Sequence, residues 1–177
     1  ARHLLLCCPF LFIKRQRLLM ERVAIFVDVQ NVYYTSRQTY RKNFDYNAFW
    51  RKATAKRQVV TAYAYAVERG DTKQREFQNI LRAIGFEVKL KPFIQRADGS
   101  AKGDWDVGIT IDMMDAANEA DTLILVSGDG DFSILCNRLT EQGGKTVEVY
   151  GVPALTAASL MQSASTFTPI DQRLLLG

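Results

Sequence analysis

Five short apolar runs alternate with segments of helical periodicity through residues 20–177, and this alternation restricts the fold more than any other feature. The first run, residues 23–27, reads VAIFV and has the β-branched and aromatic residues of a strand buried on both faces. Similar runs occupy residues 58–67, 86–90, 122–126 and 145–150. Strands that alternate with helices predict a mostly parallel sheet with helices on both faces. We therefore expect an α/β domain with a central sheet of five or six strands.

Helix start and stop signals lie between these runs. Asp45 and Asp71 stand where an N-cap is expected, and Gln74 completes a capping-box-like pattern with Asp71. Gly85 and the Gly-Gly pair after residue 142 are typical helix ends. The expected helices cover roughly residues 32–41, 45–53, 71–84, 105–117, 132–142 and 155–162. Residues 92–103 carry an Asp-Gly turn signal and little apolar pattern, which predicts a loop.

Net charge gives little support for nucleic-acid binding. The chain carries 23 basic and 19 acidic side chains, but four of the basic ones and none of the acidic ones fall in residues 1–19. Residues 20–177 are therefore about neutral, and any binding of a polyanion must come from a local basic patch. The length of 177 residues suits one domain.

Residues 1–19 are expected to lie outside the domain, as a leader that is non-native or disordered. Their apolar part, residues 4–13, is too short to cross a bilayer, and basic residues follow it where a signal peptide has a small-residue cleavage site. Met20 then precedes the first strand directly, so the domain is expected to cover residues 20–177. The alternative is a short segment that binds a membrane surface or a partner. No membrane-spanning segment is expected.

The single histidine, His3, lies in this leader, so residues 20–177 contain none. A Ser-His-Asp triad, a Cys-His pair and a histidine-ligated zinc site are therefore excluded there. Cys7 and Cys8 are adjacent in the leader, and Cys136 sits in an apolar helical segment where a small core residue is expected. Three such cysteines do not form a disulfide framework, which favours a reducing, cytoplasmic compartment.

Acidic residues collect where one edge of the sheet is expected. Asp28 ends the first strand, Asp104 and Asp106 open a helix, and Asp129 and Asp131 follow the fourth strand. The carboxyl ends of parallel strands and the N-termini of the helices that follow them meet at one edge. If the first and fourth strands are neighbours, Asp28, Asp106 and Asp129 converge. Such a group would bind Mg²⁺ or Mn²⁺, which prefer oxygen ligands and can activate water for attack on a phosphodiester.

Several of these polar residues also have a purely structural interpretation. Asp104 and Asp131 are each placed to cap a helix, and Asn31 is placed either to cap the first helix or to orient a water or phosphate. Asp112 lies six residues after Asp106, about 9 Å further along the helix, which favours a buried-polar or surface position.

Asp28 has no comparable structural role in sight. A carboxylate that ends an apolar buried strand needs a partner, because an unpaired buried charge is costly. This requirement makes Asp28 the strongest single candidate for a metal ligand.

Three segments together resemble the NYN-domain proteins, in the LabA-like branch of the PIN-like nuclease group. Residues 23–31, VAIFVDVQN, are similar to the opening strand of that family, and residues 102–107, KGDWDV, to its middle motif, with Asp112 as a recurring acid. Residues 127–132, SGDGDF, are similar to the third motif. The resemblance covers about residues 22–167.

This resemblance implies a PIN-like three-layer fold and RNA cleavage that depends on a divalent metal. Asp28, Asp106 and Asp129 would be the metal-site carboxylates, and Asn31 and Asp131 would complete or support the catalytic site. Residues of a second tier would be Asp104, Asp112 and Ser127.

The substrate would be RNA, held by basic groups on either side of the acids. Arg37 follows the Asn31 region, and Arg96 and Lys102 lie in the loop before the acidic helix, so these three are the expected phosphate-binding residues. Aromatic side chains that could stack on unpaired bases are Tyr33, Tyr34 and Phe93. The alternative for each is a solvated charge or an ordinary core aromatic residue.

The predicted function is thus a divalent-metal-dependent ribonuclease, an endonuclease on single-stranded RNA. One alternative is a regulatory domain that binds metal or RNA without catalysis. Another is a haloacid-dehalogenase-like phosphatase, although Gln30 stands where that chemistry usually needs a second Asp. A dinucleotide-binding domain is not expected, because the turn after the first strand has no glycine. Homodimer formation stays open.

Overall fold

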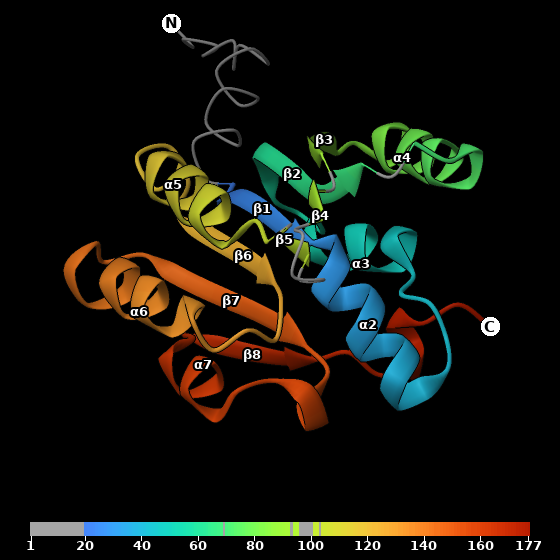
Figure 1. Ribbon diagram of the computed structural model, residues 1–177. Coiled ribbons are helices and arrows are strands. Elements are labelled where there is room, and N and C mark those ends of the chain that lie inside the picture. Colours follow the sequence, from blue (N-terminus) through green and yellow to red (C-terminus); the bar gives the residue numbers. More distant parts are fainter. Residues whose placement is uncertain (1–19, 69, 93, 96–100, 103) are drawn as a thin grey trace, which may run out of the picture.

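The computed structural model describes residues 20–68, 70–92, 94–95, 101–102 and 104–177. The expected leader, residues 1–19, falls outside them. The centre of the fold is a six-stranded parallel sheet with the order β3-β2-β1-β6-β7-β8 (Figure 1). Its strands are β1 (Arg22–Asp28), β2 (Gln58–Glu68), β3 (Glu87–Pro92), β6 (Thr122–Val126), β7 (Thr146–Gly151) and β8 (Thr166–Pro169). The α/β prediction and all five expected strands are confirmed.

Helices cover both faces of this sheet. On one side lie α2 (Val29–Tyr40), α3 (Tyr46–Ala53) and α4 (Thr72–Ile84), and on the other α5 (Asp106–Ala116), α6 (Phe132–Asn137) and α7 (Ala158–Ser163) (Figure 1). A π-helical turn, η1 (Arg138–Gln142), continues α6, and the short 3₁₀ helices are η2 (Pro153–Leu155) and η3 (Gln172–Leu174). None of the described helices has the length and apolar character needed to cross a membrane.

The predicted caps explain where two helices begin. The carboxylates of Asp45 and Asp71 accept hydrogen bonds from the backbone N–H groups of Ala48 and Gln74, at 2.9 and 2.8 Å. Gly85 ends α4 with a φ of 130°, which only glycine adopts readily. The first helix, by contrast, starts at Val29 and not near residue 32, because it follows β1 without a loop.

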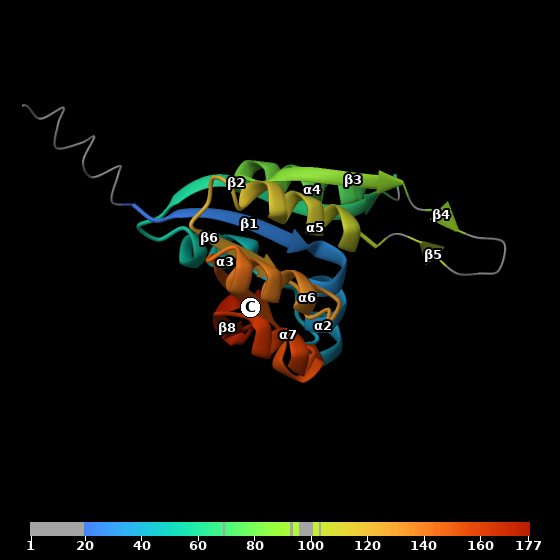
Figure 2. The same ribbon diagram turned by 90° about the vertical axis from the view of Figure 1, so that its left-hand side faces the viewer.

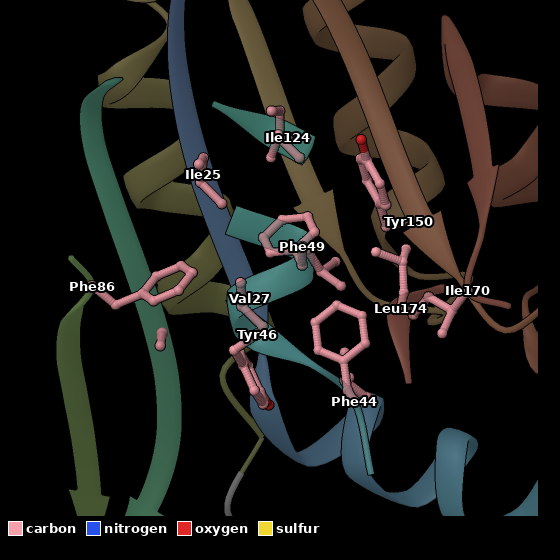
Figure 3. Packing of buried hydrophobic residues seen from close by; sticks show 14 of the residues in the cluster. Ile25, Val27, Phe44, Tyr46, Phe49, Phe86, Ile124, Tyr150, Ile170 and Leu174 are labelled. Carbon is pink, nitrogen blue, oxygen red and sulfur yellow. The ribbon is translucent and has the colours of Figure 1, made fainter. Parts of the chain in front are cut away.

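Alternate residues of β1 face two separate cores. Val23, Ile25 and Val27 pack with the aromatic residues of α3 and with the C-terminal segment (Figure 3), whereas Ala24 and Phe26 pack beneath α5, α6 and α7. Successive side chains of a strand point to opposite faces, so a strand covered on both sides must be apolar throughout. This is why the uninterrupted run of residues 23–27 predicts the centre of the sheet.

Two features differ from the sequence predictions. The strand β8 was not predicted, because its four residues, TFTP, are only partly buried and lack a continuous apolar run. The expected loop of residues 92–103 contains a short antiparallel pair, β4 (Ile94–Gln95) and β5 (Ala101–Lys102). Figure 2 shows this pair beyond the sheet, on the side where the strands end.

The strand order reverses direction between β1 and β6. From β1 the chain continues to β2 and β3 on one side, and from β6 to β7 and β8 on the other. Val27 pairs with Val126, so the carboxyl ends of these two strands lie side by side. Such a switch point is where open parallel sheets bind their ligands. The condition set from the sequence, that the first and fourth predicted strands are neighbours, is therefore met.

Candidate metal centre

A hollow of about 330 Å³ opens at the switch point, and four carboxylates line it: Asp28, Asp104, Asp106 and Asp129. We call it the acidic hollow. Its other lining residues are Gln30, Asn31, Tyr34, Thr35, Val67 and Trp105. The acids come from the end of β1, the start of α5 and the loop after β6, which are far apart in the sequence.

Asp28 lies where β1 passes into α2, and its carboxylate does two things at once. Its Oδ1 accepts a hydrogen bond of 3.1 Å from the N–H of Asn31 and so caps α2, and its Oδ2 lies 3.5 Å from the hydroxyl of Ser127. Burial, opposed by the Asn31 hydrogen bond but reinforced by the charges of Asp106 and Asp129, raises the pKa of Asp28 to about 6. The prediction that Asp28 has no structural role is wrong, because it is the N-cap.

Asn31 is not the N-cap but joins two segments of the site. Its side-chain oxygen accepts a hydrogen bond of 2.9 Å from the N–H of Gly128, which ties the first turn of α2 to the loop after β6. Gly128 is buried, and a Cβ there would lie 2.7 Å from the carbonyl oxygen of Leu155. Only glycine therefore fits at position 128 without displacing the backbone at the end of η2.

The loop after β6 is held by short polar contacts. The buried hydroxyl of Ser127 accepts a hydrogen bond of 3.2 Å from the N–H of Asp129, and the carboxylate of Asp129 accepts one of 3.0 Å from the N–H of Asp131. Asp131 is exposed and stands before α6, yet its side chain makes no cap hydrogen bond, so its predicted capping role is wrong. It lies outside the lining of the acidic hollow.

Asp106 is the first residue of α5 and lines the acidic hollow with the other acids. Burial raises its pKa, the charges of Asp129 and Asp104 raise it further, and that of Lys91 lowers it. The sequence suggested that Asp104 caps this helix. This prediction is wrong, because Trp105 occupies the N-cap position. The carbonyl oxygen of Asp104 instead accepts a hydrogen bond of 2.8 Å from the ammonium group of Lys91.

Trp105 fixes the start of α5, a role that the sequence analysis missed. Its indole N–H donates a 3.0 Å hydrogen bond to the carbonyl oxygen of Ala66, and the ammonium of Lys91 lies 4.9 Å from its ring centroid. A Cβ on Gly108 would come within 2.7 Å of the indole ring. A glycine three residues after a tryptophan in a helical first turn was the available signal, because it leaves room for the ring.

Asp112, on the same helix, has a different environment. Its Oδ2 accepts hydrogen bonds from the hydroxyl of Tyr65 and the ammonium of Lys89, both 2.7 Å long. Lys89 also lies 3.9 Å from the ring centroid of Tyr63. Asp112 does not line the acidic hollow, and its side chain is partly buried, between the buried-polar and surface positions that helix geometry suggested.

Of the three predicted phosphate-binding residues, only Arg37 has a described side chain, and it does not line the acidic hollow. Arg37 lies exposed at the end of α2 and donates to the carbonyl oxygen of Arg41 at 3.3 Å. Lys102 belongs to β5, but its side chain is outside the described part, as are Arg96 and Phe93.

The chemistry of the acidic hollow suits a hard cation, although its present geometry is open. All its acidic donors are carboxylate oxygens, and no described basic side chain forms an ion pair with Asp28, Asp106 or Asp129. Within the described ranges, no three His, Cys, Asp or Glu side chains are close enough to hold an ion as they stand. The donors therefore fit Mg²⁺ or Mn²⁺ in kind.

Comparison with known proteins agrees with the three motifs. Residues 22–171 match the sequence profile of the NYN domain. The chain belongs to the NYN domain family. Over 124 residues it is 32% identical to the low amplitude and bright protein LabA of Synechococcus elongatus, and this match covers 63% of each protein, less than two thirds of LabA. A protein of unknown function from Vibrio parahaemolyticus has a similar crystal structure, with 58% identity and a TM-score of 0.85 over 89% of this chain and 97% of that one.

Proposed function

We propose that this NYN domain is a metal-dependent ribonuclease that cleaves single-stranded RNA internally. The observation that carries the proposal is that Asp28, Asp106 and Asp129 line one hollow and form no ion pair with a described basic side chain. Burial and the charges of neighbouring acids raise the pKa of Asp28 and of Asp106, and a bound divalent ion would relieve this cost. Membership of the NYN family supports the choice of RNA as substrate.

Three carboxylates would hold the ion, Mg²⁺ or Mn²⁺: those of Asp28, Asp106 and Asp129. The ion supplies a Lewis acid that lowers the pKa of water and offsets charge on the phosphate. Because the described acids are too open to hold an ion as placed, their side chains must turn toward one another. Asn31 and Ser127 position this set, since they tie the loop after β6 to Asp28 and the first turn of α2.

The remaining acids have lesser roles in the proposal. Asp104 lines the acidic hollow and adds negative charge next to Asp106. Asp131 supports the loop from outside the lining, through its N–H and the carboxylate of Asp129. Asp112 keeps its ion pair with Lys89 and takes no ion. Arg37, Arg96 and Lys102 stay proposed contacts to phosphates further along the RNA.

The direct test is cleavage of labelled single-stranded RNA by the purified protein with Mg²⁺, with Mn²⁺ or with EDTA. An Asp28→Asn protein, purified identically, controls for a contaminating nuclease. We expect cleavage by the wild type only with metal and none by the variant. Equal cleavage by both proteins, or none by the wild type across a broad panel of RNAs, would contradict the proposal.

The open geometry of the acids favours a second candidate, a domain that binds metal or RNA without cleaving it. Retained RNA binding without metal-dependent cleavage would support this regulatory role. A phosphatase would need a carboxyl group where Gln30 stands, and Gln30 is an exposed amide at the edge of the acidic hollow. Turnover of phosphomonoesters that Asp28→Asn abolishes would support the phosphatase instead. Light scattering would show whether the chain is a homodimer.

A further inference from the structure

A second hollow, of about 490 Å³ and mostly apolar, lies directly beside the acidic one. We call it the aromatic groove, and define it by Tyr33, Tyr34, Tyr46, Phe77 and Ile80. Its walls are α2, the start of α3 and α4, and its floor is the end of β2. The volume lies within the range of sites that bind small organic groups.

The two hollows form one continuous surface, because they share the lining residues Gln30, Tyr34 and Val67. Three consecutive residues of α2 line this surface. Tyr33 lines only the aromatic groove, Tyr34 lines both hollows, and Thr35 lines only the acidic hollow. Each residue advances about 100° around a helix, so consecutive side chains face consecutive parts of the surface. Gln30 lies one helical turn before Tyr34, on the same face of α2, and it also lines both hollows. Whatever occupies the groove therefore lies next to the acids.

The groove offers two half-exposed rings, those of Tyr33 and Tyr34, together with amide groups and little net charge. The rings of Tyr33 and Tyr34 have centroids 5.4 Å apart, as do those of Tyr46 and Phe77. Exposed amide side chains at its edge are Gln30, Asn43 and Asn47. Its two carboxylates, Asp45 and Asp71, already cap α3 and α4, and Lys73 adds one positive charge.

We propose that the aromatic groove binds unpaired nucleobases next to the phosphate at the acidic hollow, and so selects single-stranded RNA. This inference rests on the proposed function. Aromatic side chains bind bases by stacking on their faces, and amides pair with base edges that a duplex would hide. A paired base offers neither its face nor its Watson–Crick edge to such a groove.

Charge makes this contribution necessary. In the metal-free protein, a hollow lined by four carboxylates repels the phosphates of RNA; Lys91 offsets only part of this charge at Asp106, and Arg37 does not line the hollow. Stacking gives attraction that needs no positive charge and depends weakly on salt, unlike contacts to phosphates. The groove thus supplies affinity where the acids cannot.

Fluorescence anisotropy in EDTA tests the groove without cleavage. Wild-type protein is titrated into fluorescein-labelled decauridylate and into an abasic ribose-phosphate decamer, which has the same charge but no bases. We expect about tenfold tighter binding of decauridylate, as one base–aromatic stack would give. Tyr33→Ala should remove this preference and Tyr33→Phe should keep it. Tyr33 is 50% exposed, so the fold tolerates both changes.

A matched pair of isoleucines provides the control. Ile80 in the groove and Ile111 on α5 are 54% and 55% exposed, and both lie on helices. Ile80→Ala should weaken binding of decauridylate by about twofold to fivefold, because it takes apolar area from the groove wall. Ile111→Ala should leave binding unchanged.

Several results would overturn the inference. These are equal binding of the two decamers by the wild type, no binding of either, a preference that survives in Tyr33→Ala, or binding of duplex RNA as tight as that of decauridylate. Self-association that both Tyr33→Ala and Ile80→Ala abolish would identify the occupant as a second copy of the chain. A base preference without any cleavage refutes only the nuclease proposal, whereas cleavage without a base preference refutes only the groove.

Discussion

Asp106 and Asp112 lie six residues apart on one helix, but their charges have opposite surroundings: a cation lies next to Asp112, and other acids lie near Asp106. Asp112 is paired with the ammonium of Lys89 and the hydroxyl of Tyr65, in a partly buried position on the face toward β2 and β3. Asp106 faces Asp129 and Asp104, and its pKa is raised. An acid with a built partner stabilises the fold, whereas acids gathered without one raise the free energy of the folded chain until a cation arrives.

The sequence alone does not separate the roles of Asp106 and Asp112. A sequence motif contains both acids, and the family resemblance gave both a place in the site. Their partners separate them, since ion pairing leaves Asp112 no free charge for a metal.

The largest effect should come from the acids of the hollow. Asp28→Asn, Asp106→Asn and Asp129→Asn each keep the side-chain shape but remove a charge, so each should lower RNA cleavage by about 100-fold or more. Combining them should add little, because the three act as one unit. Asp112→Asn, the matched control, should keep cleavage within about threefold once its protein is shown to be folded. A comparable loss for Asp112→Asn in single-turnover assays would break the comparison.

The next effect concerns stability and pH. In metal-free protein the pKa of Asp28 is about 6 against 3.8 for an ordinary Asp, so the folded state holds its proton longer than the unfolded state. The contribution of Asp28 to the stability of the wild type therefore falls as pH rises from about 4 to about 6, and Asp28→Asn lacks this contribution. At about pH 7.5 the variant should be more stable by up to about 3 kcal/mol, because Asn still caps α2.

Urea denaturation in EDTA, at about pH 4 and about pH 7.5, measures this difference. The gap should nearly close at the lower pH, where both proteins have a neutral group at this position. Added Mn²⁺ should stabilise the wild type and not the variant. A wild type that gains stability over the variant as pH rises would show that Asp28 has an unrecognised cationic partner.

A smaller effect on the free energy of unfolding, a decrease instead of an increase, is expected when Asp112 loses its partner Lys89. Lys89→Met should lower the free energy of unfolding by about 1–2 kcal/mol, because it leaves the carboxylate of Asp112 with only the Tyr65 hydroxyl. Lys89→Met combined with Asp112→Asn should cost less than the sum of the single changes, as expected for residues in contact. The exposed pair Arg22–Asp121 is the control, and Arg22→Met should have a far smaller effect. Additive losses at Lys89 and Asp112 would show that the pair is not coupled.

The smallest effect should follow Asp104→Asn. Its carboxylate does not cap α5 but lines the acidic hollow and raises the pKa of Asp106, so the change should relieve repulsion there. We expect a loss of metal affinity of about twofold to fivefold, read from the Mn²⁺ dependence of cleavage, with stability nearly unchanged. A loss as large as that of Asp106→Asn would place Asp104 among the direct ligands.

The fold could be predicted from the sequence because the apolar pattern of each main strand matches its burial in the structure. The strands β1 and β6 are buried on both faces, so their adjacent residues are all apolar and form an uninterrupted run that the sequence shows directly. The strand β8 was not predicted, because its four residues are only partly buried and show only a weak apolar pattern. The cap signals at Asp45 and Asp71 were correct, since each acts on an N–H three residues away.

The candidate site was accessible only in part. Strand ends and helix starts put Asp28, Asp106 and Asp129 at one edge of a parallel sheet, and the structure places them along one hollow. The cap roles assigned to Asp104 and Asn31 were wrong, because Trp105 and Asp28 take the cap positions. The pattern of Asp28 three residues before Asn31 could have revealed this cap.

The sequence by itself thus determined the parallel α/β class, the edge at which the acids lie and the absence of histidine from residues 20–177. Each of these follows from neighbours along the chain or from composition. Only the tertiary structure decided which acids share a hollow, that Lys89 neutralises Asp112, and that Trp105 anchors α5 to the carbonyl oxygen of Ala66. The Lys89–Asp112 pair joins residues 23 positions apart in the chain and the Trp105–Ala66 hydrogen bond residues 39 apart, and their free energy depends on burial and distance, which no local pattern encodes.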